Sequence, residues 1–428
     1  MMDLPKDFVA LMQEHLGKAQ AEALFAGLAA EPSLSVRVNP RKWSAPLSYE
    51  AVPWCRHGYY LGNRPVFTFD PLFHAGAYYV QEAGSMYLDH IVRTYAPQRP
   101  LVALDLCAAP GGKSTLLRSL LPDDSLLVSN EPMRQRAQVL AENMIKWGHP
   151  GCVVTQNFPA DFGHLSEAFD LVVVDAPCSG EGMFRKDEQA IRDWSLENVE
   201  ACVRRQRAIL QDIWPCVKPG ALVVYSTCTF NRFEDEDNAR CIAATLDAVL
   251  LEERHFFPGT DRTEGFYIAA LRKSGVGEPS PFPLSRAASL PVLDGSFEIH
   301  NTSVAQFALP LAHAAFAKKL WRTLNVLTGG VQISELKGRD WQPAHALALS
   351  TAYVRGTYPE VALAYNEAIA YLRREAVRRD APKGIVLLTY RGLPLGFAKS
   401  VNGRLNNLYP QEWRIRTTYL PEGTAEIF

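Results

Sequence analysis

Two cysteines, Cys178 and Cys228, each follow an apolar run that is typical of a buried strand. They stand in the segments VVVDAPCSGEG and ALVVYSTCTF. Ligands bind at the carboxyl ends of strands in an open α/β sheet, so we expect both thiols to face one crevice. Asp175, at the end of the first of these strands, would lie at the mouth of the same sheet. A single cysteine is often only a small core residue, but a pair at two strand ends indicates thiolate chemistry.

Two thiols in one crevice suit methylation at carbon-5 of cytosine. That carbon becomes nucleophilic only after a thiolate has added to carbon-6, and the thiolate must later be expelled. One thiol can attack while the second assists release, and residue chemistry alone leaves open which of the two attacks. A free cysteine has a pKa of about 8.5, so the thiolate needs a nearby cation or a helix N-terminus. Lys113 and the first turn after Cys178 are the candidates.

The segment VALDLCAAPGGKSTLLRSLL predicts a strand, a tight glycine-rich turn and a helix. It is not a phosphate-binding P-loop, because Cys107 stands where that motif requires glycine, and no G-x-G-x-x-G follows. A loop that binds S-adenosylmethionine fits better, since it needs close backbone approach without a pyrophosphate cradle. Glu131, at the next strand end, would accept the ribose hydroxyls, unless it only caps a helix before Pro132. Asn157, after a third strand, would bind an adenine edge, unless it is a plain turn residue.

Composition places the chain among soluble globular proteins of two to four domains. It has 428 residues, 47% hydrophobic and 21% charged, with a net charge of −2. Residues 311–428 carry 16 Lys and Arg against 9 Asp and Glu, which is compatible with a polyanion-binding appendage. No stretch is apolar enough to predict a membrane span, and the N-terminus lacks a signal-peptide pattern. The eight cysteines form no C-x-x-C pair, which argues against a zinc site and predicts free thiols in a reducing cytoplasm.

The chain changes pattern along its length. A helical start and a strand at 33–40 precede a region of alternating strands and helices, which implies a doubly wound parallel sheet. A Ser-, Pro- and Gly-rich linker follows. Beyond it, Val361, Tyr365, Ala368 and Leu372 predict one helical stripe, and a β-rich module ends the chain. The strands of the alternating region are expected at 101–106, 125–129, 152–155, 170–174, 221–226 and 265–273.

Three segments resemble the Sun-type (nucleolar-protein/Sun) RNA cytosine-5 methyltransferases: CAAPGGK (107–113), DAPCSGEGMFRK (175–186) and YSTCTF (225–230). SVRVNP and GAYYVQEAGSM resemble the N-terminal region of that family, with Arg37, Asn39, Gln81 and Ser85 as the matching residues. Within the family, the C-terminal segments are most similar to the PUA-like module of bacterial small-subunit ribosomal RNA methyltransferases of type F.

The resemblance implies a Rossmann-like S-adenosylmethionine-dependent methyltransferase core with a mostly parallel seven-stranded sheet. This α/β core would be flanked by a small α+β N-terminal domain and a C-terminal PUA-like, β-rich RNA-binding module. The expected regions are an RNA-binding N-terminal region (1–75), the catalytic domain (76–275), a linker (276–300) and a C-terminal RNA-binding region (301–428) that includes the PUA-like module (about 345–428).

The resemblance also assigns roles to residues. Cys228 would be the nucleophile and Cys178 would assist release of the product. Asp175 and Lys113 would act in catalysis, and both would also contact the cofactor. The remaining cofactor-binding residues would be Cys107, Ala108, Ala109, Pro110, Gly111, Gly112, Glu131 and Asn157, where many relatives carry aspartate at the last position.

The predicted function is S-adenosylmethionine-dependent methylation of cytosine carbon-5 in small-subunit ribosomal RNA, through a covalent cysteine–RNA intermediate. The predicted partner is ribosomal RNA or the small ribosomal subunit, and we expect a cytoplasmic monomer without a metal or a membrane. One alternative keeps the reaction but takes transfer RNA or large-subunit RNA as substrate. Another is a non-catalytic RNA-binding assembly factor. An amino-methyltransferase is disfavoured, because the strand end reads Asp-Ala-Pro-Cys and lacks the Pro-Pro-aromatic signature.

Overall fold

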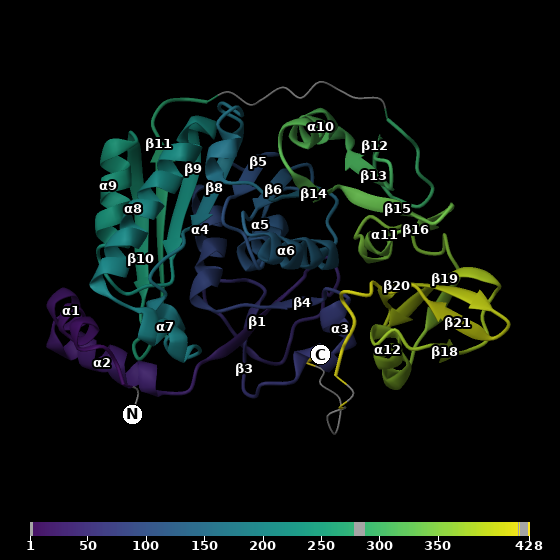
Figure 1. The fold of residues 1–428 in the computed structure, drawn as a ribbon, viewed down its shortest axis with the longest axis horizontal. Coiled ribbons are helices and arrows are strands. Elements are labelled where there is room, and N and C mark those ends of the chain that lie inside the picture. Colours follow the sequence, from purple (N-terminus) through teal and green to yellow (C-terminus); the bar gives the residue numbers. More distant parts are fainter. Residues whose placement is uncertain (1–2, 278–286, 418, 420–426) are drawn as a thin grey trace.

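The computed structural model describes residues 3–277, 287–417, 419 and 427–428. Its centre is an eight-stranded sheet with the order β10-β11-β9-β8-β5-β6-β7-β14 (Figure 1). The five inner strands run parallel, and the outer three are antiparallel to their neighbours. The parallel strands are β5 (Val102–Asp105), β6 (Leu126–Asn130), β7 (Cys152–Thr155), β8 (Phe169–Asp175) and β9 (Val217–Thr227); the others are β10 (Ala248–Phe256), β11 (Phe266–Lys273) and β14 (Val326–Gly329).

Helices cover both faces of this sheet, so successive residues of each inner strand enter different cores. In β9, Val224 packs on the face covered by α4, α5 and α6, whereas Val223 packs on the face covered by α8, α9 and α10. This two-sided burial explains why the inner strands are continuous apolar runs in the sequence. The helices are α4 (Leu88–Tyr95), α5 (Gly112–Leu120), α6 (Arg134–Trp147), α8 (Leu196–Ile213), α9 (Glu236–Thr245) and α10 (Ala314–Thr323).

The predicted fold class is confirmed, with one strand more than the seven expected. The additional strand is β14, which comes from beyond the linker and pairs with β7 through Val326 and Thr155. Without β14, β7 would have been an edge strand with an unpaired ladder. A four-residue strand carries too little periodic pattern to be recognised in a sequence. Residues 278–286 of the predicted linker lie outside the described part of the chain, and β12 already begins at Phe297 within it.

The N-terminal region consists of a helical hairpin and a small antiparallel sheet of order β2-β3-β1-β4. The expected strand at 33–40 is β1 (Leu34–Val38). The hairpin does not cover this sheet but lies beside α7 (Figure 1), and Phe8 packs against Phe184 and Trp194. The remaining elements are α1 (Lys6–Leu16), α2 (Lys18–Ala29), β2 (Glu50–Ala51), β3 (Gly58–Leu61), α3 (Pro71–His74), β4 (Tyr78–Val80) and α7 (Glu188–Asp193).

The C-terminal region holds two further sheets. The first has the order β12-β13-β15-β16, and the second has the order β17-β19-β20-β21-β18. The predicted helical stripe is wrong at its start: Val361 lies in strand β17, and the helix begins only at Tyr365, because Val361 pairs with Leu388 in the sheet. The bounds are β12 (Phe297–Asn301), β13 (Ala305–Pro310), β15 (Val331–Lys337), β16 (Asp340–Pro343), α11 (His345–Leu349), β17 (Glu360–Ala362), α12 (Tyr365–Leu372), β18 (Val377–Arg378), β19 (Gly384–Tyr390), β20 (Leu393–Val401) and β21 (Arg404–Asn407).

The last sheet and the N-terminal sheet share one hydrophobic core, although they are far apart in the sequence. The Tyr365 hydroxyl donates to the carbonyl oxygen of Phe69 at 3.0 Å. The Tyr409 hydroxyl lies 3.3 Å from Nδ1 of His74. The C-terminal module is therefore docked beside the sheet that borders the catalytic domain.

Candidate active site

A cavity of about 420 Å³ lies at the carboxyl ends of β5, β8 and β9. Its volume is in the range of pockets that hold a cofactor-sized ligand. Six segments form its wall: the N-terminal segment 79–85, the loop after β5, the strand end at Asp175, the segment 182–186, the loop at Cys228, and the segment 264–266. The described residues that line it are Tyr79, Val80, Gln81, Glu82, Ser85, Cys107, Ala108, Ala109, Pro110, Gly112, Lys113, Asp175, Gly182, Met183, Lys186, Cys228, Glu264, Gly265 and Phe266.

The predicted cofactor loop, Cys107 to Gly112, forms one wall of the cavity. Contacts from outside hold its backbone: Arg136 donates to the carbonyl oxygen of Ala109 at 3.0 Å, and Asn143 donates to that of Pro110 at 2.8 Å. Burial and neighbouring carboxylates raise the pKa of the Cys107 thiol, so it stays protonated. The loop thus presents a rigid and largely uncharged surface to the cavity.

Gly112, the first residue of α5, is informative about what the cavity holds. A Cβ atom added there would come no nearer than 3.5 Å to Cε1 of Tyr79, an ordinary contact distance. Folding therefore does not require glycine at this position, and its backbone is open to a ligand that approaches closely. Gly111 differs, because its φ of +114° requires glycine for the turn itself, and it does not line the described cavity. The loop fits a cofactor that packs directly on the start of α5.

Lys113 and Asp175 form an ion pair inside the cavity. Lys113 Nζ lies 2.8 Å from Oδ2 of Asp175, and the Ser226 hydroxyl donates to Oδ1 at 2.8 Å. Burial lowers the pKa of Lys113, but the Asp175 carboxylate, aided by Cys228, more than compensates and raises it above its ordinary value. The ammonium group also lies 4.7 Å from the ring centroid of Phe266. Lys113 is therefore a fixed cation at the cavity wall.

The two cysteines meet, as predicted, but they are not equivalent. Cys178 Sγ lies 3.2 Å from Cys228 Sγ. Among the described residues, Cys228 lines the cavity, whereas Cys178 does not. The hydrogen bond with Cys228, then burial, raises the pKa of Cys178 well above its ordinary value, and the charge of Glu234 adds to this. Cys228 and Lys113 thus both line the cavity, whereas the neighbouring Cys178 thiol, outside the lining, keeps its proton.

Glu131 and Asn157 lie outside the group of residues that line this cavity. Glu131 is 2% exposed, and its carboxylate accepts the N–H of Met133 at 3.0 Å and lies 3.4 Å from Arg136. The Asn157 side chain accepts the N–H of Asn325 at 3.0 Å. The two residues are nevertheless neighbours of the loop, because Asn130 donates both to the carbonyl oxygen of Leu106 and to that of Asn157.

Three of the N-terminal residues that the resemblance marked, Arg37, Gln81 and Ser85, form a hydrogen-bonded chain that reaches α5. Arg37 is 1% exposed and donates to Oε1 of Gln81 at 2.8 Å and to Oγ1 of Thr115 in α5 at 2.6 Å. Gln81 in turn donates to Oγ of Ser85 at 3.1 Å. These contacts attach the segment 79–85 to α5. The small N-terminal sheet is therefore part of the cavity wall.

Sequence reasoning missed Glu82 and Glu264, which line the cavity and are linked to each other. Glu82 accepts the backbone N–H groups of Gly84 and Ser85, each at 2.8 Å, and of Glu264 at 3.0 Å. Glu264 forms an ion pair with Arg185 at 2.9 Å. Glu82 directly follows Gln81 in the segment that resembles the N-terminal region of the family, and only this position in the sequence could have pointed to it.

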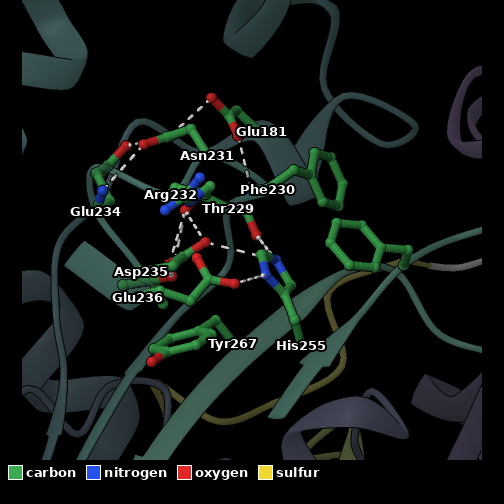
Figure 2. Close-up of polar contacts among 12 residues, drawn as sticks. Glu181, Thr229, Phe230, Asn231, Arg232, Glu234, Asp235, Glu236, His255 and Tyr267 are labelled. Carbon is green, nitrogen blue, oxygen red and sulfur yellow. Dashed lines mark hydrogen bonds and ion pairs between the residues drawn. The ribbon is translucent and has the colours of Figure 1, made fainter. Parts of the chain in front are cut away.

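A second set of missed residues lies on the loops that follow the two cysteines in the sequence, and Figure 2 shows the polar contacts among them. Glu181, Glu234 and Asp235 are carboxylates with 0% exposure. The Thr229 hydroxyl donates to Asp235 at 3.0 Å, and Asn231 donates to both glutamates at 2.9 Å each. In the sequence, the run EDED at 234–237 is typical of a solvated charged segment, so its burial could not be anticipated. The network joins the loops that carry the two thiols.

All eight cysteines are free thiols, as the sequence predicted. No helix in the described ranges is long and apolar enough to cross a membrane.

Comparisons with known proteins cover nearly the whole chain. Residues 92–272 match the family model of the 16S rRNA methyltransferase RsmB/F, and residues 4–83 match the N-terminal domain of 16S rRNA methyltransferase RsmF. Residues 358–415 match the methyltransferase RsmF PUA domain. The ribosomal RNA small subunit methyltransferase F of Cronobacter sakazakii is 30% identical, with 96% of each chain covered.

Two solved structures from Pyrococcus horikoshii share the fold. A methyltransferase homolog protein is 24% identical with a TM-score of 0.56, covering 64% of this chain and 96% of its own. NSun6, whose crystal structure was determined with SFG, is 20% identical with a TM-score of 0.55, covering 64% of this chain and 99% of its own. The family predicted from the sequence motifs is confirmed, and with it the methyl donor. This chain belongs to the 16S rRNA methyltransferase RsmB/F family of S-adenosylmethionine-dependent methyltransferases.

Proposed function

We propose that this chain methylates carbon-5 of cytosine in small-subunit ribosomal RNA, with Cys228 as the covalent nucleophile. The observation that carries the proposal is the asymmetry of the two thiols. Cys228 lines the cavity and Cys178 does not, although only 3.2 Å separates their sulfur atoms. Residue chemistry had left open which thiol attacks, and access to the cavity favours Cys228.

S-adenosylmethionine would supply an electrophilic methyl group. The backbone of Cys107, Ala108, Ala109, Pro110, Gly111 and Gly112 would hold it, with Lys113 and Asp175 at its reactive end. Glu131 would accept the ribose hydroxyls in exchange for Arg136, whose side chain is 58% exposed. Asn157 would contact the adenine edge. Gly112 lines the cavity, and a Cβ there would make only ordinary contacts with Tyr79 and Gln81, which supports this placement of the loop against a ligand.

The chain's own residues account for the covalent steps. Lys113 stabilises the Cys228 thiolate, whose sulfur forms a bond to carbon-6 of the base. Asp175 holds Lys113 and is available to the amidine edge of cytosine. Carbon-5 then takes the methyl group and loses its proton to water. The carbon-5–carbon-6 double bond re-forms, and the sulfur–carbon-6 bond breaks with its electron pair returning to Cys228. A thiol at Cys178 donates a hydrogen bond to that departing thiolate.

Membership of an rRNA methyltransferase family and the docked C-terminal module support ribosomal RNA as the substrate. The surplus of basic residues in 311–428 fits a surface that neutralises phosphates. We expect the protein to act as a monomer in the cytoplasm.

Transfer of tritiated methyl groups tests the proposal. Three substrates are compared, namely small ribosomal subunits, naked small-subunit RNA and bulk transfer RNA, each with the parent protein, Cys228→Ala and Cys178→Ala. We expect 5-methylcytosine in a ribosomal substrate, no transfer with Cys228→Ala, and a denaturation-resistant RNA adduct with Cys178→Ala. Methylation of transfer RNA alone would show that the substrate is transfer RNA and not ribosomal RNA. An adduct with Cys228→Ala, but none with Cys178→Ala, would reverse the roles of the cysteines.

A further inference from the structure

Two buried carboxylates, Glu181 and Glu234, connect the loops that carry the two thiols, and Glu234 is the one that reaches the residue next to Cys178. It accepts the backbone N–H of Ser179, the residue after Cys178, at 3.0 Å. It also accepts Nδ2 of Asn231, three residues after Cys228, at 2.9 Å (Figure 2). A third donor, Nε2 of Gln206 in α8, lies at 2.7 Å. The side chain of Gln206 donates in addition to the carbonyl oxygen of Pro177 at 3.1 Å. Glu234 and Gln206 thus hold the Cys178 loop on both sides of the cysteine.

The connection is specific to the Cys178 side of the site. A separate carboxylate, Asp235, accepts the hydroxyls of Thr227 and Thr229, which flank Cys228. The two loops also meet directly where Gly182 donates its N–H to the carbonyl oxygen of Cys228 at 2.8 Å. Glu181 joins the two loops further along, through Phe230 and Asn231. Glu234 is therefore the carboxylate whose loss would free the backbone directly beside Cys178.

Glu234 affects the Cys178 loop through its charge as well as through its hydrogen bonds. Burial raises the pKa of Glu234, and hydrogen bonds from the neutral N–H groups of Ser179, Asn231 and Gln206 oppose that rise by favouring the carboxylate. A negative charge beside the Cys178 loop favours the protonated thiol there. Lys113 lines the cavity together with Cys228. Attack by Cys228 requires that the Cys228 thiol has lost its proton while the Cys178 thiol keeps its own.

We infer that Glu234 is a positioning residue for product release, holding the Cys178 thiol against the sulfur of Cys228. The inference rests on the proposed function. In the release step, the carbon-5 proton passes to water, the carbon-6–sulfur bond breaks, and its electron pair returns to Cys228. The S–H of Cys178 donates a hydrogen bond to that sulfur. Glu234 touches neither the base nor the sulfur atoms, and it acts by holding the donor in place.

The test is Glu234→Gln in the full chain, with Glu236→Gln as the matched control. The control makes the same chemical change two residues on, at a carboxylate that pairs with His255. In Glu234→Gln one oxygen becomes an NH₂ group, which must face another N–H donor whichever way the amide is turned. A rapid-mixing assay with excess RNA measures the first-turnover burst and the steady-state rate, and a denaturing gel measures the RNA adduct.

We expect the burst of Glu234→Gln to stay within about twofold of the parent, because Cys228 and Lys113 are untouched. The steady-state rate should fall about tenfold or more, since charge-assisted hydrogen bonds are lost. The adduct should accumulate as in Cys178→Ala. Glu236→Gln should match the parent in all three measurements.

Two results would overturn the inference. One is a steady-state rate within twofold of the parent. The other is an equal loss of burst and steady-state rate, which indicates a merely structural role. If Glu234→Gln does not fold, Glu234→Asp keeps the charge but shortens the reach, and it must show the same selective loss of release. Failure of the proposed function is distinct, because the parent itself would then form neither methylcytosine nor adduct.

Discussion

Replacement of Gly112 by alanine separates the needs of folding from those of cofactor binding. The added Cβ meets Tyr79 and Gln81 at 3.5 Å or more, so no atom has to move. Replacing glycine by alanine where the backbone is compatible stabilises a protein by about 0.4–1 kcal/mol, because the unfolded chain loses freedom. We therefore expect the free energy of unfolding to stay constant or rise by that amount.

Cofactor binding should respond in the opposite direction. The new methyl group would occupy space at the cavity wall that we assign to the ligand. Overpacking of a tight contact costs about 1–3 kcal/mol, which corresponds to roughly 5- to 160-fold weaker binding. Equilibrium dialysis with tritiated S-adenosylmethionine measures the affinity, and urea unfolding followed by tryptophan fluorescence measures the stability.

The neighbouring Gly111→Ala is the contrasting control. Its φ of +114° is unfavourable for alanine, and the added Cβ would lie 3.3 Å from Cδ1 of Leu140. It should lower the free energy of unfolding by about 1–2 kcal/mol. An affinity of Gly112→Ala within twofold of the parent would refute the placement of the cofactor against the start of α5. A loss of more than about 1 kcal/mol in the free energy of unfolding of Gly112→Ala would refute the argument that an added Cβ fits there without a clash.

Three further substitutions test the site and the docking of the domains. Lys113→Met should lower the methyl-transfer rate about 100-fold, because the cavity that Cys228 lines loses the cation paired with Asp175; initial rates of methyl transfer check this, and a rate within twofold of the parent would contradict the role of Lys113. His74 is buried with a pKa lowered to about 3 by desolvation and Lys146, so the unfolded chain binds the proton more readily and stability should fall by about 1.4 kcal/mol per pH unit below the unfolded pKa of about 6.5. Urea unfolding at pH 7 and pH 5 should show a smaller acid loss in His74→Gln than in the parent, and equal losses would argue against a neutral buried imidazole. Gly76→Ala should be severely destabilising, by about 3 kcal/mol or more, since its Cβ would lie 1.9 Å from the carbonyl oxygen of Lys146; thermal unfolding checks this, with Gly62→Ala, which meets nothing within 4 Å, as the near-neutral control.

The sequence by itself determined the five parallel strands of the central sheet and β11, but neither β10 nor β14. Strands buried on both faces must be continuous apolar runs, and β5 to β9 are recognisable for that reason. The same logic located the site residues that stand directly at strand ends, because strand order in an α/β sheet dictates where such ends converge. Cys107, Asp175 and Cys228 were in this way expected at one crevice and do line the cavity, and the sulfur of Cys178 lies 3.2 Å from that of Cys228. Motif spacing was sufficient for them because each is attached to a regular element.

Only the tertiary structure decided which thiol faces the cavity and what supports the other. A sequence does not encode the direction of a loop side chain, so Cys178 and Cys228 look alike until their loops are folded. The burial of Glu234 and Asp235 depends on α8, β9 and the N-terminal hairpin packing together from distant parts of the chain. Local composition around 234–237 indicates solvent exposure, and long-range packing overrides it. The roles of charged residues were thus decided by their surroundings, which strand and helix patterns do not specify.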